Sequence, residues 1–157
     1  MSYAFSSKAT CQEYFGKAHD MVRKSVKAFV DKEILPFIDD WEEAGEFPRE
    51  LYQKAAAVGI LGTGYPEAYG GIPGDIFFHI AVSEELMRSG SGGLVAGLGS
   101  LNIAIPPILL AGTESQKEQF VKPVLAGEKI AALAITEPGG GSDVASLQTT
   151  AVREGDY

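Results

Sequence analysis

In the stretch Thr136-Glu137-Pro138-Gly139-Gly140-Gly141-Ser142-Asp143, three consecutive glycines stand between two hydroxyl-bearing residues. Because glycine has no side chain and tolerates positive φ, the amides of such a run can approach a ligand closely. The resulting concavity suits a phosphate group or the polar edge of a ring. No lysine adjoins the glycines and their spacing is not G-x-G-x-x-G, which excludes the P-loop and the dinucleotide fingerprint. A flexible turn is the alternative, since a single glycine-rich loop is a weak motif.

The segments on either side of this loop have the character of β-strands. Apolar residues lie among alanines in Lys129–Thr136, which predicts a mostly buried strand, and Gln148–Arg153 predicts a second one. Glu154-Gly155-Asp156 then predicts a turn that only Tyr157 follows. A strand pair cut at its return leaves an unpaired edge. We therefore expect a fragment, with an all-helical domain over residues 1–127 and the start of a β domain over residues 128–157.

The sequence before the loop has helical periodicity. Apolar residues recur at three- and four-residue steps, Pro36 should bend the chain, and Asp75 can cap a helix. Thr113 and Gln116 form a capping-box signature before another apolar face that Gly127 closes. A long ordered loop is expected over residues 59–74, where glycine and proline replace the apolar stripe. The predicted helices cover residues 11–33, 34–41, 48–58, 75–89 and 113–127.

The residues from Ser89 to Thr113 include no charged residue, which raises the question of a membrane span. Pro106-Pro107, Asn102 and Ser100 argue against a span, because each is costly in lipid. A helix that is apolar on all sides also occurs at the buried centre of a helical domain. We predict the buried helix and no membrane span.

Composition excludes several classes of function. The 157 residues include 13 Lys+Arg and 21 Asp+Glu, so the net charge is −8, which disfavours nucleic acid as a partner. Cys11 is the only cysteine, and with two histidines the chain can form neither a disulfide within itself nor a Cys/His zinc site. His19 and His79 are expected in surface or capping roles. No signal peptide is visible, so a cytoplasmic location is expected; the mitochondrial matrix is the alternative.

The whole series of motifs closely resembles the flavin-dependent acyl-CoA dehydrogenases. The resemblance begins with the glycine-rich stretch Ile135–Asp143, and ordered matches extend over most of the chain. The other landmarks are Glu46-Phe47-Pro48, Gly59-Ile60-Leu61-Gly62, Pro66-Glu67-Ala68-Tyr69-Gly70-Gly71, Glu84-Glu85-Leu86, Gly112-Thr113-Glu114-Ser115-Gln116-Lys117, Thr149, Ala151 and Gly155-Asp156.

The resemblance implies a mainly α fold, in which an N-terminal helical-bundle domain precedes the first strands of a truncated β-barrel-like domain. It also implies that FAD is the cofactor. The backbone of Leu133, Ala134, Ile135 and Thr136, with the Thr136 hydroxyl, would meet the pyrimidine edge of the flavin. Gly141 and Ser142 would contact the FAD pyrophosphate, and Ser142 would also touch the acyl-CoA substrate. The family often has alanine where this chain has Gly140, which is a minor departure.

The reaction implied by the resemblance is α,β-dehydrogenation of an acyl-CoA thioester to the trans-2-enoyl-CoA, as in fatty-acid β-oxidation. In the family, a glutamate removes the pro-R α-proton while the β-hydride moves to flavin N5. That glutamate would lie beyond Tyr157, so no catalytic residue is assigned in these residues and the fragment alone should be inactive. Glu84-Glu85 and Glu137 are stand-ins that we do not expect to act, since such pairs are usually solvated or capping.

The uncharged helix has a further implied role as a wall of the fatty-acyl cavity. There Gly99 and Ile103, with neighbouring small residues, would leave the wall low and apolar. The alternative is that its glycines only let helices approach one another closely.

The family also implies electron-transferring flavoprotein as the electron acceptor and a homo-oligomer, a tetramer or a dimer. Three functions stay open at this point. The first is the dehydrogenase, and the second is a relative of the same fold, such as an acyl-CoA oxidase or a flavin monooxygenase. The third is a non-catalytic helical module that binds a partner through an acidic face.

Overall fold

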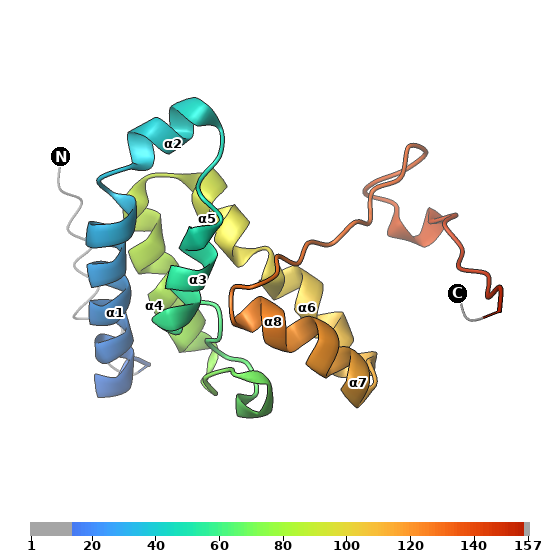
Figure 1. Cartoon of the computed structure of the whole chain (residues 1–157), viewed down its shortest axis with the longest axis horizontal. Helices are drawn as coiled ribbons and strands as arrows, with labels where there is room; N and C mark the ends of the chain where they lie inside the picture. The colour runs from blue at the N-terminus through green and yellow to red at the C-terminus, as the bar shows by residue number, and fades with distance from the viewer. Residues whose placement is uncertain (1–13, 156–157) are drawn as a thin grey trace.

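The computed structural model describes residues 14–155, as a body of helices followed by a C-terminal arm (Figure 1). The mainly α fold predicted from the sequence is confirmed. The first three residues of the predicted helix 11–33, Cys11 among them, lie outside the described residues. The same holds for Asp156 at the predicted final turn.

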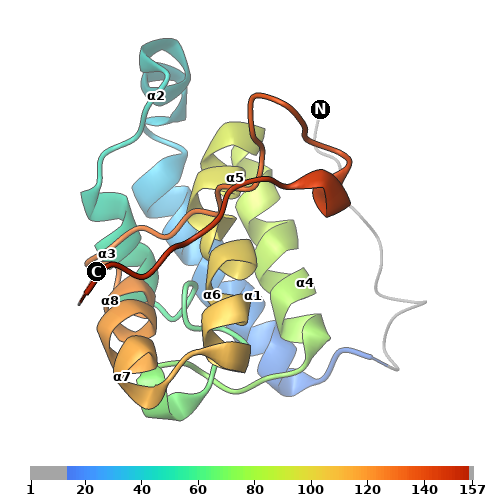
Figure 2. The same cartoon turned by 90° about the vertical axis from the view of Figure 1, so that its right-hand side faces the viewer.

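Helix α1 (Lys17–Phe29) packs against α4 (Ile76–Leu86), and these two helices run side by side in the body (Figures 1 and 2). The long first helix ends in a π-helical turn, Val30–Ile34. After the turn at Pro36, α2 (Ile38–Ala44) begins, and Gly45 ends it at a φ of 72°. The predicted bend at Pro36 is therefore confirmed, with the second helix displaced by a few residues.

Helix α3 (Glu50–Ala57) follows, and the ordered loop predicted over residues 59–74 leads on to α4. The loop contains the 3₁₀ turn Glu67–Tyr69 and a single parallel bridge between Thr63 and Ile72. Tyr65 is buried, and its hydroxyl donates to Oδ1 of Asn102 at 3.0 Å. The loop is thus part of the packed body.

The second half of the body consists of α5 (Gly92–Gly99), α6 (Leu101–Ala111), α7 (Glu114–Gln116), the π turn Lys117–Val121 and α8 (Lys122–Leu125). Asp75 caps α4 as predicted, by accepting from the amides of Phe77 and Phe78. The capping box of Thr113 and Gln116 is formed as predicted. Each cap satisfies amides that have no partner within the first turn of a helix.

Helix α6 continues through Pro106 and Pro107 without interruption. A proline inside a helix leaves the carbonyl four residues earlier without its usual partner. Those carbonyls belong to Asn102 and Ile103, both exposed, so water can satisfy them. Together, α5 and α6 form a stretch of 20 residues, Gly92–Ala111, that is long and apolar enough to cross a membrane. Only 28% of its most apolar 18-residue window is buried in the described body, so the prediction of a buried helix is wrong for most of this stretch. Length and apolar composition by themselves are weak evidence for a membrane span, because core helices of soluble proteins have the same composition.

The hydrophobic core lies where these helices meet. Its largest fully buried side chains come from both halves of the body, so the helices form a single core. These side chains are Val26, Val30, Ile34, Leu51, Leu98, Ile105 and Val121.

The chain leaves the body at Gly127, which has a φ of 72°. A Cβ at this position would lie 2.5 Å from the carbonyl oxygen of Tyr52, so only glycine fits. Arg49 Nη2 donates to the carbonyl of Glu128 at 3.2 Å, and Ala131 still packs against the core. Beyond Ala131 the arm extends away from the helices (Figure 1).

The two strands predicted over Lys129–Thr136 and Gln148–Arg153 are not formed. Between residues 128 and 155 the structure has one isolated bridge, Glu137 with Gly140, and a 3₁₀ turn, Val144–Ser146. A strand exists only through hydrogen bonds to a neighbouring strand. Within the described residues the two segments do not pair with each other or with the helical body, so each stays extended without a ladder.

Candidate functional site

The glycine-rich stretch forms a tight hairpin. The amide of Glu137 donates to the carbonyl of Gly140 at 3.0 Å, and the amide of Gly140 donates back to Glu137 at 3.1 Å. Pro138 and Gly139 form its tip. A Cβ on Gly141 would lie 3.7 Å from Cγ2 of Thr136. The structure therefore brings Thr136 and Gly141 together, two of the residues predicted to bind the cofactor.

The Glu137 side chain closes a larger loop around this hairpin. Its Oε2 accepts from the amide of Gln148 at 2.9 Å and its Oε1 from the amide of Thr149 at 2.7 Å. The Thr149 side chain and these two amides hold the pKa of the Glu137 carboxyl below its usual value. Glu137 is consequently engaged as a hydrogen-bond acceptor within the loop.

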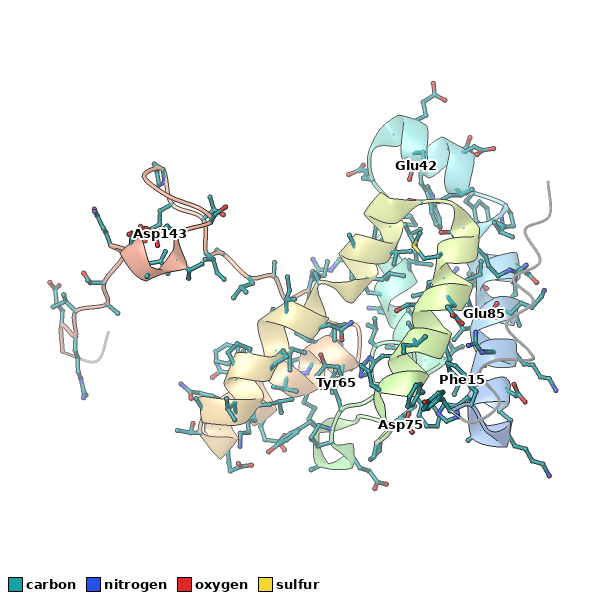
Figure 3. All side chains as sticks on the ribbon, turned by 180° about the vertical axis from the view of Figure 1, so that it is seen from behind. Phe15, Glu42, Tyr65, Asp75, Glu85 and Asp143 are labelled. Carbon is teal, nitrogen blue, oxygen red and sulfur yellow. The ribbon has the colours of Figure 1, made fainter. Side chains whose placement is uncertain are left out.

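The far side of the loop is a 3₁₀ turn, Val144–Ser146. The Ser146 hydroxyl donates to the Asp143 carboxylate, and the Ser146 amide donates to the Asp143 carbonyl. Asp143 lies on the arm, well away from the helical body (Figure 3). Both carboxylates of the loop are thus occupied by internal hydrogen bonds.

The loop has backbone donors to spare. In the part of the chain that the structure describes, the amides of Gly139, Gly141, Ser142 and Asp143 donate to no protein acceptor. A Cβ on Gly139 or Gly140 would meet nothing within 4 Å, so alanine at position 140 would fit. None of the three glycines has a positive φ, so no backbone conformation in this structure requires them. Free backbone amides in a run without bulky side chains suit the oxygens of a pyrophosphate.

The remaining predicted cofactor contacts, Leu133, Ala134, Ile135 and Thr136, lie in the extended arm just before the hairpin. All four are exposed, and their backbone groups take part in no hydrogen bond among the described residues. They are therefore accessible to a ligand edge. Ser142 is exposed as well.

The residues predicted to line the acyl cavity lie elsewhere, on α5 and α6. Ile103 is 61% exposed. A Cβ on Gly99 would have only an ordinary contact, 3.8 Å from Nδ2 of Asn102. The structure does not bring Gly99 and Ile103 together with Ser142, because residues 132–155 hydrogen-bond only among themselves in the described part of the chain.

Gly97 behaves differently from Gly99. A Cβ on Gly97 would lie 2.9 Å from Cζ of Phe47, and the carbonyl of Gly97 accepts from the Tyr52 hydroxyl at 3.1 Å. Close packing against the Phe47 side chain, which lies between α2 and α3, therefore explains Gly97. It does not explain Gly99, which has room for a side chain.

The other candidate carboxylates are held in ion pairs. Arg23 pairs with Glu84, and its Nη1 lies 3.9 Å from Oε1 of Glu85. Arg88 Nη1 also lies 3.4 Å from Oε2 of Glu85. Both glutamates are thus held by arginines of the helical body. Among residues 14–155, no three side chains of His, Cys, Asp or Glu gather closely enough to hold a metal ion.

Three features were not apparent from the sequence. Glu137 is the acceptor that closes the loop, and His19 is buried against Asp75. A cavity of about 460 Å³ is bordered by Trp41, Phe47 and Tyr52, among other residues. None of these has a sequence signal, because each depends on residues that are distant along the chain.

Comparison with known proteins decides the family. Residues 16–128 match the model of the acyl-CoA dehydrogenase N-terminal domain. The chain belongs to the acyl-CoA dehydrogenase family. The long-chain specific acyl-CoA dehydrogenase of Rattus norvegicus is 42% identical over 90% of this chain and 33% of its own length. The caffeyl-CoA reductase-Etf complex subunit CarC of Acetobacterium woodii is 40% identical over 92% of this chain and 38% of its own.

Solved structures of acyl-CoA dehydrogenases agree with this assignment. That of Geobacillus kaustophilus superposes with a TM-score of 0.81 at 39% identity, covering 92% of this chain and 38% of that one. An FAD complex from Bacillus anthracis gives a TM-score of 0.78 at 36% identity, covering 87% of this chain and 23% of that one. The chain thus spans well under half of the length of these relatives, and it carries the family's N-terminal helical domain.

Proposed function

We propose that this chain contributes the N-terminal helical domain and the cofactor loop of an FAD-dependent enzyme. The enzyme removes the α and β hydrogens of an acyl-CoA thioester and yields the trans-2-enoyl-CoA. The observation that carries the proposal is the loop itself, where unpartnered amides of Gly141 and Ser142 lie beside Thr136. A family relative solved in complex with FAD supports it.

The residues present fit an FAD in their chemistry. The backbone of Leu133–Thr136 and the Thr136 hydroxyl would hold the pyrimidine edge, because these groups donate and accept without adding charge. The amides of Gly141 and Ser142 would hold the pyrophosphate, and the Ser142 hydroxyl would contact the acyl-CoA. Glu137 and Asp143 are negatively charged near this position, and their internal hydrogen bonds direct both carboxylates toward the protein.

When bound, FAD supplies the acceptor for the hydride that leaves the β-carbon. The α-proton needs a carboxylate base of tuned pKa. Glu84, Glu85 and Glu137 are all engaged with other groups. We therefore assign the base to a glutamate outside the described residues. Gly99 and Ile103 would form a low apolar wall for the acyl chain, which gives the apolar run Gly92–Ala111 a role other than crossing a membrane.

A second direction of reaction is favoured by one observation. The Acetobacterium woodii relative is named as a reductase in a complex with Etf. The same site could therefore reduce an enoyl-CoA, with electron-transferring flavoprotein as the redox partner in either direction.

We further propose that the enzyme is a homo-oligomer in the cytoplasm and that the boundary between its helical domain and its β domain lies at residue 127.

The test uses the complete polypeptide that carries this sequence. We expect the purified protein to show the visible absorption of bound flavin, and saturated acyl-CoA to bleach it without oxygen. A protein reduced beforehand and reoxidised by enoyl-CoA, but not bleached by acyl-CoA, would instead be a reductase. Production of hydrogen peroxide in air would indicate an oxidase. Absence of flavin would overturn the proposal and favour a non-catalytic helical module.

A further inference from the structure

Glu137 holds together the two ends of the glycine-rich loop. Its two carboxylate oxygens accept from two consecutive amides, those of Gln148 and Thr149, at 2.9 and 2.7 Å. These amides lie 11 and 12 residues further along the chain. Hydrogen bonds to a charged acceptor are stronger than those between neutral groups. The carboxylate is therefore positioned to fix the loop from one side.

No other interaction in residues 14–155 has the same effect. The remaining hydrogen bonds of the loop are local: Glu137 with Gly140, Asp143 with Ser146, and Val144 with Leu147. Among the described residues, only the Glu137 carboxylate joins the hairpin to Gln148 and Thr149 by hydrogen bonds. Without the carboxylate, the segment that bears Gly141 and Ser142 would be tethered only through the backbone.

We propose that Glu137 is a positioning residue for FAD, closing the loop so that the amides of Gly141 and Ser142 stay directed at the pyrophosphate. It does so through the Gln148 and Thr149 amides and does not touch the cofactor. This inference rests on the FAD site proposed above. It predicts that the Glu137 side chain gives the loop the shape that binds FAD without itself contacting FAD.

The sign of the effect separates this role from a purely electrostatic one. A negative charge near a pyrophosphate opposes binding, so removing that charge should by itself tighten FAD binding. If Glu137 instead organises the loop, its removal should weaken binding. The carboxamide introduced by Glu137→Gln would offer one acceptor oxygen and turn an NH₂ donor toward a second amide donor, so this variant should lose part of the closure. Glu137→Ala should lose all of it.

The experiment measures the FAD dissociation constant of the complete polypeptide after removal of its flavin, from the change in flavin fluorescence. We expect Glu137→Gln to weaken binding about tenfold and Glu137→Ala about a hundredfold, from the loss of one or two charge-assisted hydrogen bonds. Glu154→Gln removes the same charge from the same arm outside the loop and should leave the constant unchanged. Helical circular dichroism checks that each variant is folded.

Hydrogen exchange supplies a readout that does not depend on flavin. The amides of Gln148 and Thr149 should exchange faster in both Glu137 variants than in the parent protein or Glu154→Gln. If Glu137→Gln binds FAD as tightly as the parent protein or more tightly, the positioning role is wrong while the FAD site stands. If the parent protein itself binds no FAD, the proposed function fails, and the positioning role fails with it.

Discussion

His19 Nε2 lies 3.2 Å from Oδ1 of Asp75, although 56 residues separate them in sequence. The same Oδ1 caps α4 by accepting from the amides of Phe77 and Phe78. At the other side of the ring, His19 Nδ1 accepts from the amide of Gly16, so the tautomer with its hydrogen on Nε2 satisfies both bonds. One carboxylate oxygen thus joins the start of α1 to the start of α4.

The first prediction concerns the pH dependence of this junction. Desolvation raises the pKa of Asp75, but hydrogen bonds from His19, Phe77 and Phe78 outweigh it and lower the pKa below its usual 3.8. A carboxyl whose pKa is lower in the folded state than in the unfolded state stabilises the fold at pH values above its unfolded pKa. This stabilisation is lost as the pH falls through the folded pKa. Below pH 3.8, the free energy of unfolding measured with denaturant should therefore fall more steeply with decreasing pH in the parent protein than in Asp75→Asn. Parallel curves for the two proteins would contradict this.

The second prediction compares two glycines of α5. Gly97→Ala places a Cβ 2.9 Å from the Phe47 ring, whereas a Cβ on Gly93 meets nothing within 4 Å. Both changes gain similar helix propensity, so their difference isolates the steric contact. We expect Gly97→Ala to be less stable than Gly93→Ala by about 1–3 kcal/mol, the usual cost of overpacking. Urea unfolding of both variants measures the difference, and equal stabilities would show that the ring moves aside freely.

The third prediction concerns Tyr65 at high pH. Burial raises the pKa of its hydroxyl to about 12, from a usual value of 10.0. The folded state favours the neutral phenol, so the contribution of Tyr65 to the free energy of unfolding should be constant below pH 10. It should fall as the pH rises from 10 toward about 12, because in this range the phenol ionises in the unfolded chain but stays neutral in the folded protein. Tyr65→Phe should be less stable at neutral pH by about 1 kcal/mol, through loss of the bond to Asn102. Its free energy of unfolding, measured with denaturant, should also fall less steeply above pH 10 than that of the parent protein.

The fourth prediction concerns the acyl wall. Gly99 has room for a side chain, in contrast to Gly97, so Gly99→Phe should fold and should shorten the preferred acyl chain in the complete enzyme. Gly99→Ala is the control and should alter the preference little. The measurement is kcat/KM for a series of acyl-CoA chain lengths. An unchanged series for Gly99→Phe would remove Gly99 from the cavity wall.

Local signals in the sequence predicted much of the helical body. Asp75, Thr113 and Gln116 cap helices as expected, since a cap depends on residues only two or three positions apart. The two π turns were not predicted, because one additional residue in a turn leaves little trace in the apolar periodicity. Pro106 and Pro107 lie inside α6, because solvent can satisfy the carbonyls that they leave free.

The candidate site was predicted less completely, for a similar reason. The glycine run pointed to the loop directly. The strands around it were predicted from apolar composition, but strand formation depends on a partner that composition does not supply. The closure of the loop by Glu137 and the burial of His19 against Asp75 are contacts between distant residues, and no local pattern encodes them.

The exit of the chain at Gly127 has a consequence for how the domain tolerates mutation. A Cβ there would collide with main-chain atoms of α3, which cannot swing aside as a side chain can. A substitution would therefore turn the whole arm through a new angle while leaving each helix intact. If the loop holds FAD as proposed, a substitution at this position would give a flavin-poor protein with normal helix content, and a screen for unfolding alone would overlook it.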